Sequence, residues 1–459
     1  MTDTVEHLRA HRDRHLEELK DFVRIPSVSA KSEHRADVKA AAEWVAERML
    51  EAGLQTAELQ PTDGHPIVLG EWRGAQNAPT LLVYGHYDVQ PPEPLDEWSS
   101  PPFEPTIRDG KLFARGSVDD KGQLFLYLKA IEAHISARGK LPVNIVLLVE
   151  GEEEVGSPHL ESFLVENRER LACDAVLISD TGMFAPGLPS ITRGLRGLAY
   201  LEVTVRGPRS DLHSGSYGGA VVNPANALAR IIAQLHDDAG RITIPGFYDD
   251  VVELSDAERQ RIAELPHEEE ELRTEVGAPQ LDGEQGFSAL ERVWVRPTLD
   301  VNGLLAGYTG EGAKTVLPGR AMAKVSMRLV PNQSHRDIEE KFTRYVQSLA
   351  PGGVTIEIEP LHGGEPWYAD PQHPIFESAA RALEKAFGRP PVFIREGGSI
   401  PIVQALQETL EAPVVLIGFA LPGANAHAPD EWFSLDNFAR GAEAITNLLD
   451  EAASLPASR

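Results

Sequence analysis

The chain has 459 residues, of which 42% are hydrophobic, so it is long enough to form more than one globular core. Its 70 acidic and 43 basic residues give a formal net charge of -27, which disfavours nucleic acids and anionic membranes as partners. A single cysteine, Cys173, excludes an internal disulfide, and no apolar run approaches the ~20 residues needed to cross a bilayer. Because the N-terminus also lacks the apolar core of a signal peptide, we expect a cytoplasmic protein.

The first part of the chain alternates between helical and strand-like segments. Helical periodicity covers residues 4–24 and 35–52, and the pair Asp109 and Gly110 predicts the turn of a hairpin. The further elements expected in chain order are a strand at 80–84, a helix at 122–137, a strand at 144–149, a helix at 158–171 and a strand at 175–179. This alternation predicts an α/β fold with a mostly parallel sheet and helices on both faces.

A second pattern begins near residue 197. Residues 198–205 and 323–329 alternate like half-buried antiparallel strands, and a helix is expected at 224–236. Residues 249–286 are acidic and lack periodicity, so we expect a solvated insertion there. This pattern predicts an α+β domain.

After about residue 373 the first pattern returns. The expected elements are a helix at 374–387, a strand at 392–395, a strand at 413–419 and a helix at 435–449. We therefore expect residues 1–196 and 373–459 to form one α/β domain, into which the α+β domain of residues 197–372 is inserted.

Histidine or carboxylate side chains follow the expected strands of the first domain. Alone, the run Glu152–Glu154 would indicate a solvated acidic turn. The other strand-end residues are His86, Asp88, Asp119, Asp180 and His427. Because an open α/β sheet presents its functional groups at the carboxyl ends of its strands, these side chains are expected to meet at one edge. Imidazoles and carboxylates without cysteine suit zinc or manganese in a hydrolytic site.

Taken together and in order, these motifs resemble the di-zinc exopeptidases that include carnosinase, aminoacylase, succinyl-diaminopimelate desuccinylase and glutamate carboxypeptidase. The resemblance covers nearly the whole chain and is strongest to the carnosinase and cytosolic non-specific dipeptidase branch. The segments that carry it are Glu-Gly-Glu-Glu-Glu-Val-Gly-Ser at 150–157, Asp-Leu-His-Ser-Gly at 211–215, Gly-Ala-Lys-Thr-Val at 312–316 and Arg-Glu-Gly-Gly-Ser-Ile-Pro at 395–401.

The resemblance implies two divalent metal ions per chain, zinc in the first place, with manganese or cobalt as alternatives. One ion would take His86, Asp119 and Asp180, and the other Asp119, Glu154 and His427, so that Asp119 bridges the two. It also implies a cis peptide bond after Asp119.

The predicted catalytic residues are Glu153, Asp88 and His213. Asp88 follows His86 by two residues on the same face of a strand, so it can fix the imidazole. Glu153 would be the general base, with a merely supporting carboxylate as the alternative. The resemblance implies that His213 reaches the active site of a neighbouring subunit and helps to hold the carbonyl oxygen, which requires a homodimer. A solvated loop histidine is the alternative.

The predicted substrate-binding residues are Arg328, Glu396, Gly397, Gly398 and Ser399. Arg328 resembles the arginine that pairs with the substrate carboxylate, and a structural ion pair is the alternative. The glycines and Ser399 would leave room for the bound peptide, and Glu396 would pair with its ammonium group.

The sequence therefore predicts a metal-dependent dipeptidase in which water, placed between two ions and deprotonated by Glu153, attacks a peptide bond. The inserted domain would act as a lid and dimerisation domain. In the resembling family, an Asp at the position of Asp180 is typical of dipeptidases and aminopeptidases. The alternatives are an amidohydrolase acting on N-acyl amino acids, a catalytically silent metal-dependent binding protein, and a hinge-bending solute-binding protein, which the missing signal peptide disfavours.

Overall fold

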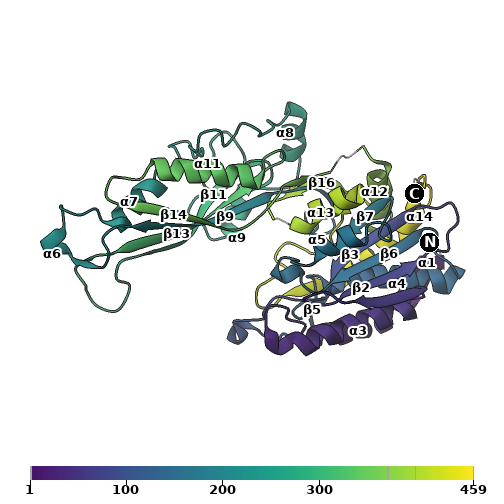
Figure 1. Ribbon diagram of the computed structural model, residues 1–459. Helices are drawn as coiled ribbons and strands as arrows, with labels where there is room; N and C mark the ends of the chain where they lie inside the picture. Colours follow the sequence, from purple (N-terminus) through teal and green to yellow (C-terminus); the bar gives the residue numbers. More distant parts are fainter. Residues whose placement is uncertain (1–2, 370–371, 399, 458–459) are drawn as a thin grey trace. The chain divides into compact units, whose positions relative to one another are not determined.

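The computed structural model describes residues 3–369, 372–398 and 400–457 (Figure 1). The chain divides into two compact units. Unit 1 comprises Met1–Arg193, Ala369–Ile394 and Ile402–Arg459, and unit 2 comprises Gly194–Tyr368 and Arg395–Pro401. The expected domain boundaries lie within a few residues of these limits. The short segment Arg395–Pro401 differs, because it belongs to unit 2 and was expected in the first domain.

The main sheet runs in the order β1-β2-β6-β3-β7-β17-β8, and β8 also pairs with the short strands β15 (Trp367–Tyr368) and β16 (Val392–Glu396). Its other strands are β1 (Thr56–Gln60), β2 (Ile67–Trp72), β3 (Thr80–His86), β6 (Asn144–Glu150), β7 (Ala175–Ile178), β8 (Ser190–Leu195) and β17 (Val414–Leu416). The neighbours β6, β3, β7 and β17 pair in parallel. The pairs toward the edges are antiparallel. The sheet is therefore mixed, and its parallel centre coincides with the continuous apolar runs of the sequence.

Helices cover both faces of this sheet. The connection from β3 to β6 contains α4 (Lys121–Arg138), and the connection from β6 back across β3 to β7 contains α5 (Leu160–Glu166). Because parallel crossovers are right-handed, two steps in opposite directions place α4 and α5 on opposite faces. Buried α4 packs against α1 (Asp3–Ala10), α2 (Arg12–Val23) and α14 (Leu435–Ala452). Further helices of this unit include α3 (Arg35–Glu51), which packs on β1 and β2, and α12 (Pro374–Phe387), which packs on α14.

A small three-stranded sheet lies beside the start of α4. It has the order β18-β5-β4, with β4 at Thr106–Arg108, β5 at Lys111–Phe113 and β18 at Trp432–Ser434. Asp109 and Gly110 connect β4 to β5 with φ angles of 48° and 73°, as a tight hairpin turn requires. The predicted hairpin is confirmed.

The predicted helix at 4–24 is interrupted. At His11 the backbone leaves helical geometry, with φ -112° and ψ 14°, and separates α1 from α2. Neither glycine nor proline marks this position, so apolar periodicity alone could not reveal the break.

Unit 2 is built on an antiparallel sheet in the order β11-β13-β9-β14. Residues of β9 and β13 alternate between buried and half-buried, as their period of two predicts. Helices α7 and α11 pack on this sheet and close its core. The bounds are β9 (Gly197–Arg206), α7 (Pro224–Ile232), β11 (Thr298–Ala306), β13 (Arg320–Leu329), α11 (His335–Ser348) and β14 (Thr355–Gly364).

The acidic insertion is more ordered than the sequence suggested. It contains α8 (Asp256–Ala263), which begins with a capping box formed by Ser255 and Glu258, and α9 (Glu269–Glu275). At its end, buried Glu284 accepts two hydrogen bonds of 2.8 Å from the Arg296 guanidinium. The remaining short elements are β10 (Leu212–His213), α6 (Ser214–Tyr217), α10 (Ala289–Trp294), β12 (Val316–Leu317) and α13 (Pro401–Leu410).

Within the described ranges, no helix is both long enough and apolar enough to cross a membrane.

The central strand β6 offers a direct test of the core. Leu147 is completely buried in β6, so Leu147→Ala is expected to cost about 2–5 kcal/mol of unfolding free energy through lost contacts and a cavity. Leu50 on α3 is 51% exposed, and Leu50→Ala is a size-matched control expected to change stability by less than about 0.5 kcal/mol. Differential scanning calorimetry should separate the two variants. Equal melting temperatures would contradict this packing.

Candidate metal centre

Five side chains from separate segments of unit 1 meet at one edge of its sheet. His86 ends β3, Glu154 follows β6, and Asp180 follows β7. Asp119 lies two residues before the start of α4, and His427 lies in the loop after β17. Because β3, β6, β7 and β17 are parallel, their carboxyl ends share this edge, as expected from the sequence.

The first group of possible ligands comprises His86, Asp119 and Asp180, whose ligand atoms all lie within 4.8 Å of one another. His86 Nε2 is 3.2 Å from Asp119 Oδ1 and 3.9 Å from Asp180 Oδ2. His86 is completely buried, whereas both carboxylates retain some exposure. Three ligand atoms therefore converge on one point beside the sheet.

The second group comprises Asp119, Glu154 and His427. His427 Nε2 is 2.8 Å from Asp119 Oδ2 and 3.3 Å from Glu154 Oε2. Asp119 thus directs Oδ1 toward the first group and Oδ2 toward the second. The two groups coincide with the two ligand sets predicted from the sequence, including the shared aspartate.

The protonation pattern of His86 fits a metal ligand. Its Nδ1 lies 3.1 Å from the Asp88 backbone oxygen and 3.3 Å from Asp88 Oδ1, so the ring proton belongs on Nδ1. Nε2 then carries a lone pair, and it is buried without a hydrogen-bond partner in the described part of the chain. A buried lone pair facing two carboxylates calls for a cation between them.

Electrostatics point the same way. Burial and the neighbouring Asp119 and Asp120 carboxylates raise the pKa of Asp180 well above its usual value. Burial also raises the pKa of Glu153 to about 8, and the Glu154 and Asp119 carboxylates act in the same direction. Cations would offset this crowding of like charges.

Glu153 lies in a short 3-10 turn, Glu153–Val155, directly after β6. The turn is supported from behind by Glu150, whose Oε1 accepts hydrogen bonds from Tyr84 (2.6 Å) and Ser157 (2.7 Å). Its neighbour Glu152 turns away and lies 2.7 Å from His159 Nδ1. The three consecutive glutamates therefore have different surroundings.

Asp88 is a completely buried positioning residue. Besides its contacts with His86, its Oδ2 accepts a hydrogen bond of 3.2 Å from the Glu154 backbone N–H. Gln90, which sequence reasoning missed, donates to Glu154 Oε2 at 2.7 Å. Asp88 and Gln90, which both follow β3, thus hold ligands of both groups in place.

Glu431 was also missed, and it holds the backbone around Asp119. This buried carboxylate accepts hydrogen bonds from the N–H groups of Gly116 (2.9 Å), Val118 (2.9 Å) and Asp119 (3.2 Å). It also accepts a hydrogen bond of 2.7 Å from Arg115. Its position four residues after His427 could have indicated a role near the site. Its partners could not be predicted, because they lie more than 300 residues away in sequence.

The backbone on either side of the site has unusual geometry. The peptide bond between Asp119 and Asp120 is cis, which confirms the expectation from the resemblance. A side chain at Gly122 would meet the Ser117 oxygen at 1.9 Å, so only glycine fits where α4 starts. His427 has a left-handed backbone, with φ 64°, a strained conformation that is common at functional sites.

His213 belongs to unit 2, where β10 pairs with β12 and places His213 opposite Val316. The residue is exposed, and its Nδ1 accepts a hydrogen bond of 3.0 Å from the Gly215 N–H. An Nδ1 that accepts leaves the proton of the neutral ring on Nε2. The exposed ring can therefore donate a hydrogen bond.

Arg328 and the segment after β16 lie together in unit 2. Arg196, which sequence reasoning missed, donates from Nε to the Gly397 oxygen (3.1 Å) and from its backbone N–H to the Gly398 oxygen (3.1 Å). Burial and the neighbouring Arg328 guanidinium lower the pKa of Arg196 to about 10. Glu396 is half-buried at the end of β16, and Ser399 lies outside the described residues.

Peptidase family M20/M25/M40 matches residues 82–451. A Cys-Gly metallodipeptidase from Schizosaccharomyces pombe is 35% identical over 97% of this chain and 96% of its own length. A Beta-Ala-His dipeptidase from Homo sapiens is 30% identical over 98% of this chain and 92% of its own length. The crystal structure of an M20 family metallo-carboxypeptidase from Sulfolobus solfataricus is 35% identical, with a TM-score of 0.86 over 96% of this chain and 99% of that chain. The family match and the identity over nearly the whole length show that this chain belongs to peptidase family M20/M25/M40.

Proposed function

We propose that this protein is a dipeptidase that depends on two divalent metal ions. The observation that carries the proposal is the placement of Asp119, whose two carboxylate oxygens face two separate groups of ligands. His86 and Asp180 would complete one ligand set, and Glu154 and His427 the other. Zinc is the first choice for such nitrogen and oxygen ligands, with manganese or cobalt as alternatives.

Two divalent ions, when bound, polarise the attacking water and the peptide carbonyl. The chain itself supplies proton transfer and orientation. Glu153 takes a proton from the attacking water and returns it to the amine that leaves. Asp88 and Glu431 keep the ligands His86 and Asp119 in place through the hydrogen bonds described above.

Similarity to two named dipeptidases supports a dipeptide substrate. Asp180 supports the same choice through the family resemblance. The guanidinium groups of Arg196 and Arg328 repel each other, and the Asp300 carboxylate acts on both in the opposite direction. This pair of arginines would hold the peptide carboxylate. The similar metallo-carboxypeptidase favours a second candidate, removal of the C-terminal residue from longer peptides.

Unit 1 would be the catalytic domain and unit 2 a lid and dimerisation domain. In a homodimer, the Nε2–H of His213 would donate to the carbonyl oxygen of a substrate bound by the other subunit. A cytoplasmic location fits the single cysteine and the charge balance.

A substrate panel tests the proposal. The kcat/KM for a dipeptide with free termini should be at least tenfold higher than that for its N-acetylated form or for a tripeptide with the same residues. A tenfold difference corresponds to roughly 1.4 kcal/mol of transition-state stabilisation. Faster cleavage of the tripeptide would favour the carboxypeptidase. Faster cleavage of N-acyl amino acids would favour the amidohydrolase.

Glu153→Gln should lower kcat by about 10²–10⁴-fold and leave the metal content unchanged, because it removes proton transfer without removing a predicted ligand. Glu152→Gln is the matched control, since this neighbour contacts His159. It should keep most of the activity. The test combines steady-state kinetics with elemental analysis, and a Glu153→Gln variant with near-normal kcat would place the base elsewhere.

Complementation tests the role of His213 across subunits. His213→Ala and Glu153→Gln chains should each be nearly inactive alone. After subunit exchange they should recover up to about a quarter of the parent activity, because half of the chains are in mixed dimers and one of the two sites in each is intact. Light scattering and a differential tag verify the exchange. Absence of recovery in verified mixed dimers would rule out action across subunits.

A further inference from the structure

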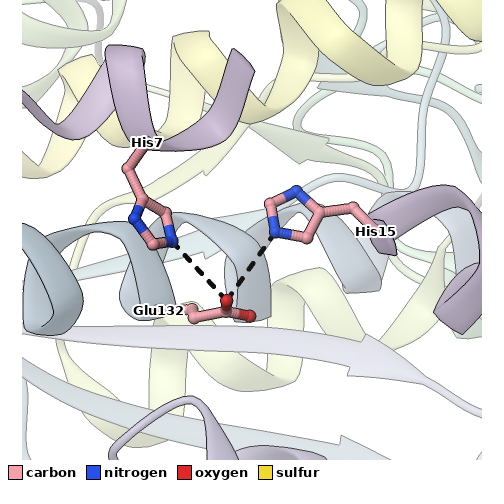
Figure 2. Close-up of side chains that lie close together, drawn as sticks. All are labelled: His7, His15 and Glu132. Carbon is pink, nitrogen blue, oxygen red and sulfur yellow. Dashed lines mark ion pairs between the residues drawn. The ribbon is translucent and has the colours of Figure 1, made fainter. Parts of the chain in front are cut away.

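A second cluster of possible metal ligands lies in unit 1 where α1 and α2 pack on α4. Figure 2 shows His7 on α1, His15 on α2 and Glu132 on α4 with both rings pointing at the same carboxylate. Their ligand atoms all lie within 4.8 Å of one another. None of the three residues belongs to the catalytic groups.

The distances are those of ligands around an ion rather than of hydrogen-bonded partners. His7 Nε2 and His15 Nε2 lie 3.6 Å and 3.7 Å from the same atom, Glu132 Oε1. Two ligands of a tetrahedral zinc, each about 2.1 Å from the ion, are separated by roughly 3.4 Å. The two His–Glu132 separations are therefore close to this value, and all three ligand atoms lie within 4.8 Å of one another.

The break between α1 and α2 contributes to this arrangement. In an uninterrupted helix, residues eight positions apart point about 80° away from each other. At His11 the backbone leaves helical geometry, and the rings of His7 and His15 both face Glu132. The ring of His11 takes a different role, because its Nδ1 lies 2.9 Å from the His7 backbone oxygen.

Both imidazoles have Nε2 atoms suited to ligation. Arg14 Nη2 lies 3.1 Å from His15 Nε2, and since a guanidinium can only donate, this nitrogen carries a lone pair. His7 Nε2 is buried and has no hydrogen-bond partner among the residues that the structure describes. His15 itself is only 3% exposed.

Cations already surround the Glu132 carboxylate. Arg14 donates to Oε1, and Lys129 donates to Oε2 at 2.7 Å. Arg14 is 44% exposed and also pairs with Glu18 at 2.7 Å, so its guanidinium can leave Oε1 without losing every partner. An ion would replace Arg14, while Lys129 would keep the second oxygen oriented.

We propose that His7, His15 and Glu132 form a third metal site, which binds a divalent transition-metal ion such as zinc in place of the Arg14 guanidinium. Two imidazoles and one carboxylate suit such ions, whereas magnesium and calcium prefer oxygen ligands alone. A bound ion would link the N-terminal helices to α4, the helix that starts directly after Asp119 and Asp120. Its role would be structural, and the proposal does not depend on the dipeptidase activity.

The test compares zinc content. The full-length chain without an affinity tag is stripped with a chelator, reloaded with Zn²⁺, dialysed and analysed for zinc per chain. The double variant His7→Gln/His15→Gln should bind about one zinc fewer than the parent, whatever number the catalytic groups hold. His11→Gln, on the same segment, is the matched control and should retain the full content. Equal zinc in the parent and the double variant would overturn the proposal.

Arg14→Ala provides a second measurement, whose expected result would not be seen if the three side chains bound no metal ion. Removing the competing guanidinium should tighten zinc binding at this site on the order of tenfold in a competition titration with a chromogenic chelator. Circular dichroism verifies that each variant is folded. If the double variant does not fold, the Arg14→Ala titration decides, and zinc affinity equal to or weaker than that of the parent overturns the proposal.

Discussion

Repulsion among crowded, half-buried carboxylates is the constraint on which the catalytic edge of unit 1 depends. Asp119, Asp180, Glu153 and Glu154 converge beside His86, and the raised pKa values of Asp180 and Glu153 express the resulting strain. Such a cluster persists only where cations compensate it and where the backbone is held firmly. The parallel strands bring the carboxylates together, and the hydrogen bonds to Glu431, Asp88 and Glu150 keep them from separating.

The support extends to the N-terminal helices. Lys121, the first residue of α4, is completely buried and donates to the backbone oxygens of Phe22 (3.2 Å) and Ile25 (2.6 Å) at the end of α2. The start of α4 therefore connects the bridging Asp119 with α2. Glu132 lies further along the same helix, so the proposed third ion would fasten α4 to α1 and α2 a second time. Helix α4 thus both follows the bridging Asp119 and packs against the N-terminal helices.

Much of this arrangement could be predicted because its signals are local. Apolar runs ending in His86, Glu154 or Asp180 identify both the parallel strands and the residues at their carboxyl ends. Asp119 and His427 were also candidates from the local pattern, because they follow the expected hairpin and the expected strand at 413–419. The bridging role of Asp119 and the cis peptide required the family resemblance. Arg196 and Glu431 escaped prediction because their partners are distant in sequence, and the helix break at His11 has no glycine or proline to mark it. The helices of the acidic insertion were missed because they bury few apolar residues.

Anomalous diffraction from zinc-loaded crystals would show whether Asp119 joins two metal ions. We expect two peaks beside Asp119, about 3.5–4 Å apart, with one Asp119 oxygen coordinating each ion. His86 and Asp180 should complete the sphere of one ion, and Glu154 and His427 that of the other. A single peak beside Asp119, or two peaks that Asp119 does not bridge, would exclude the bridging role of this residue.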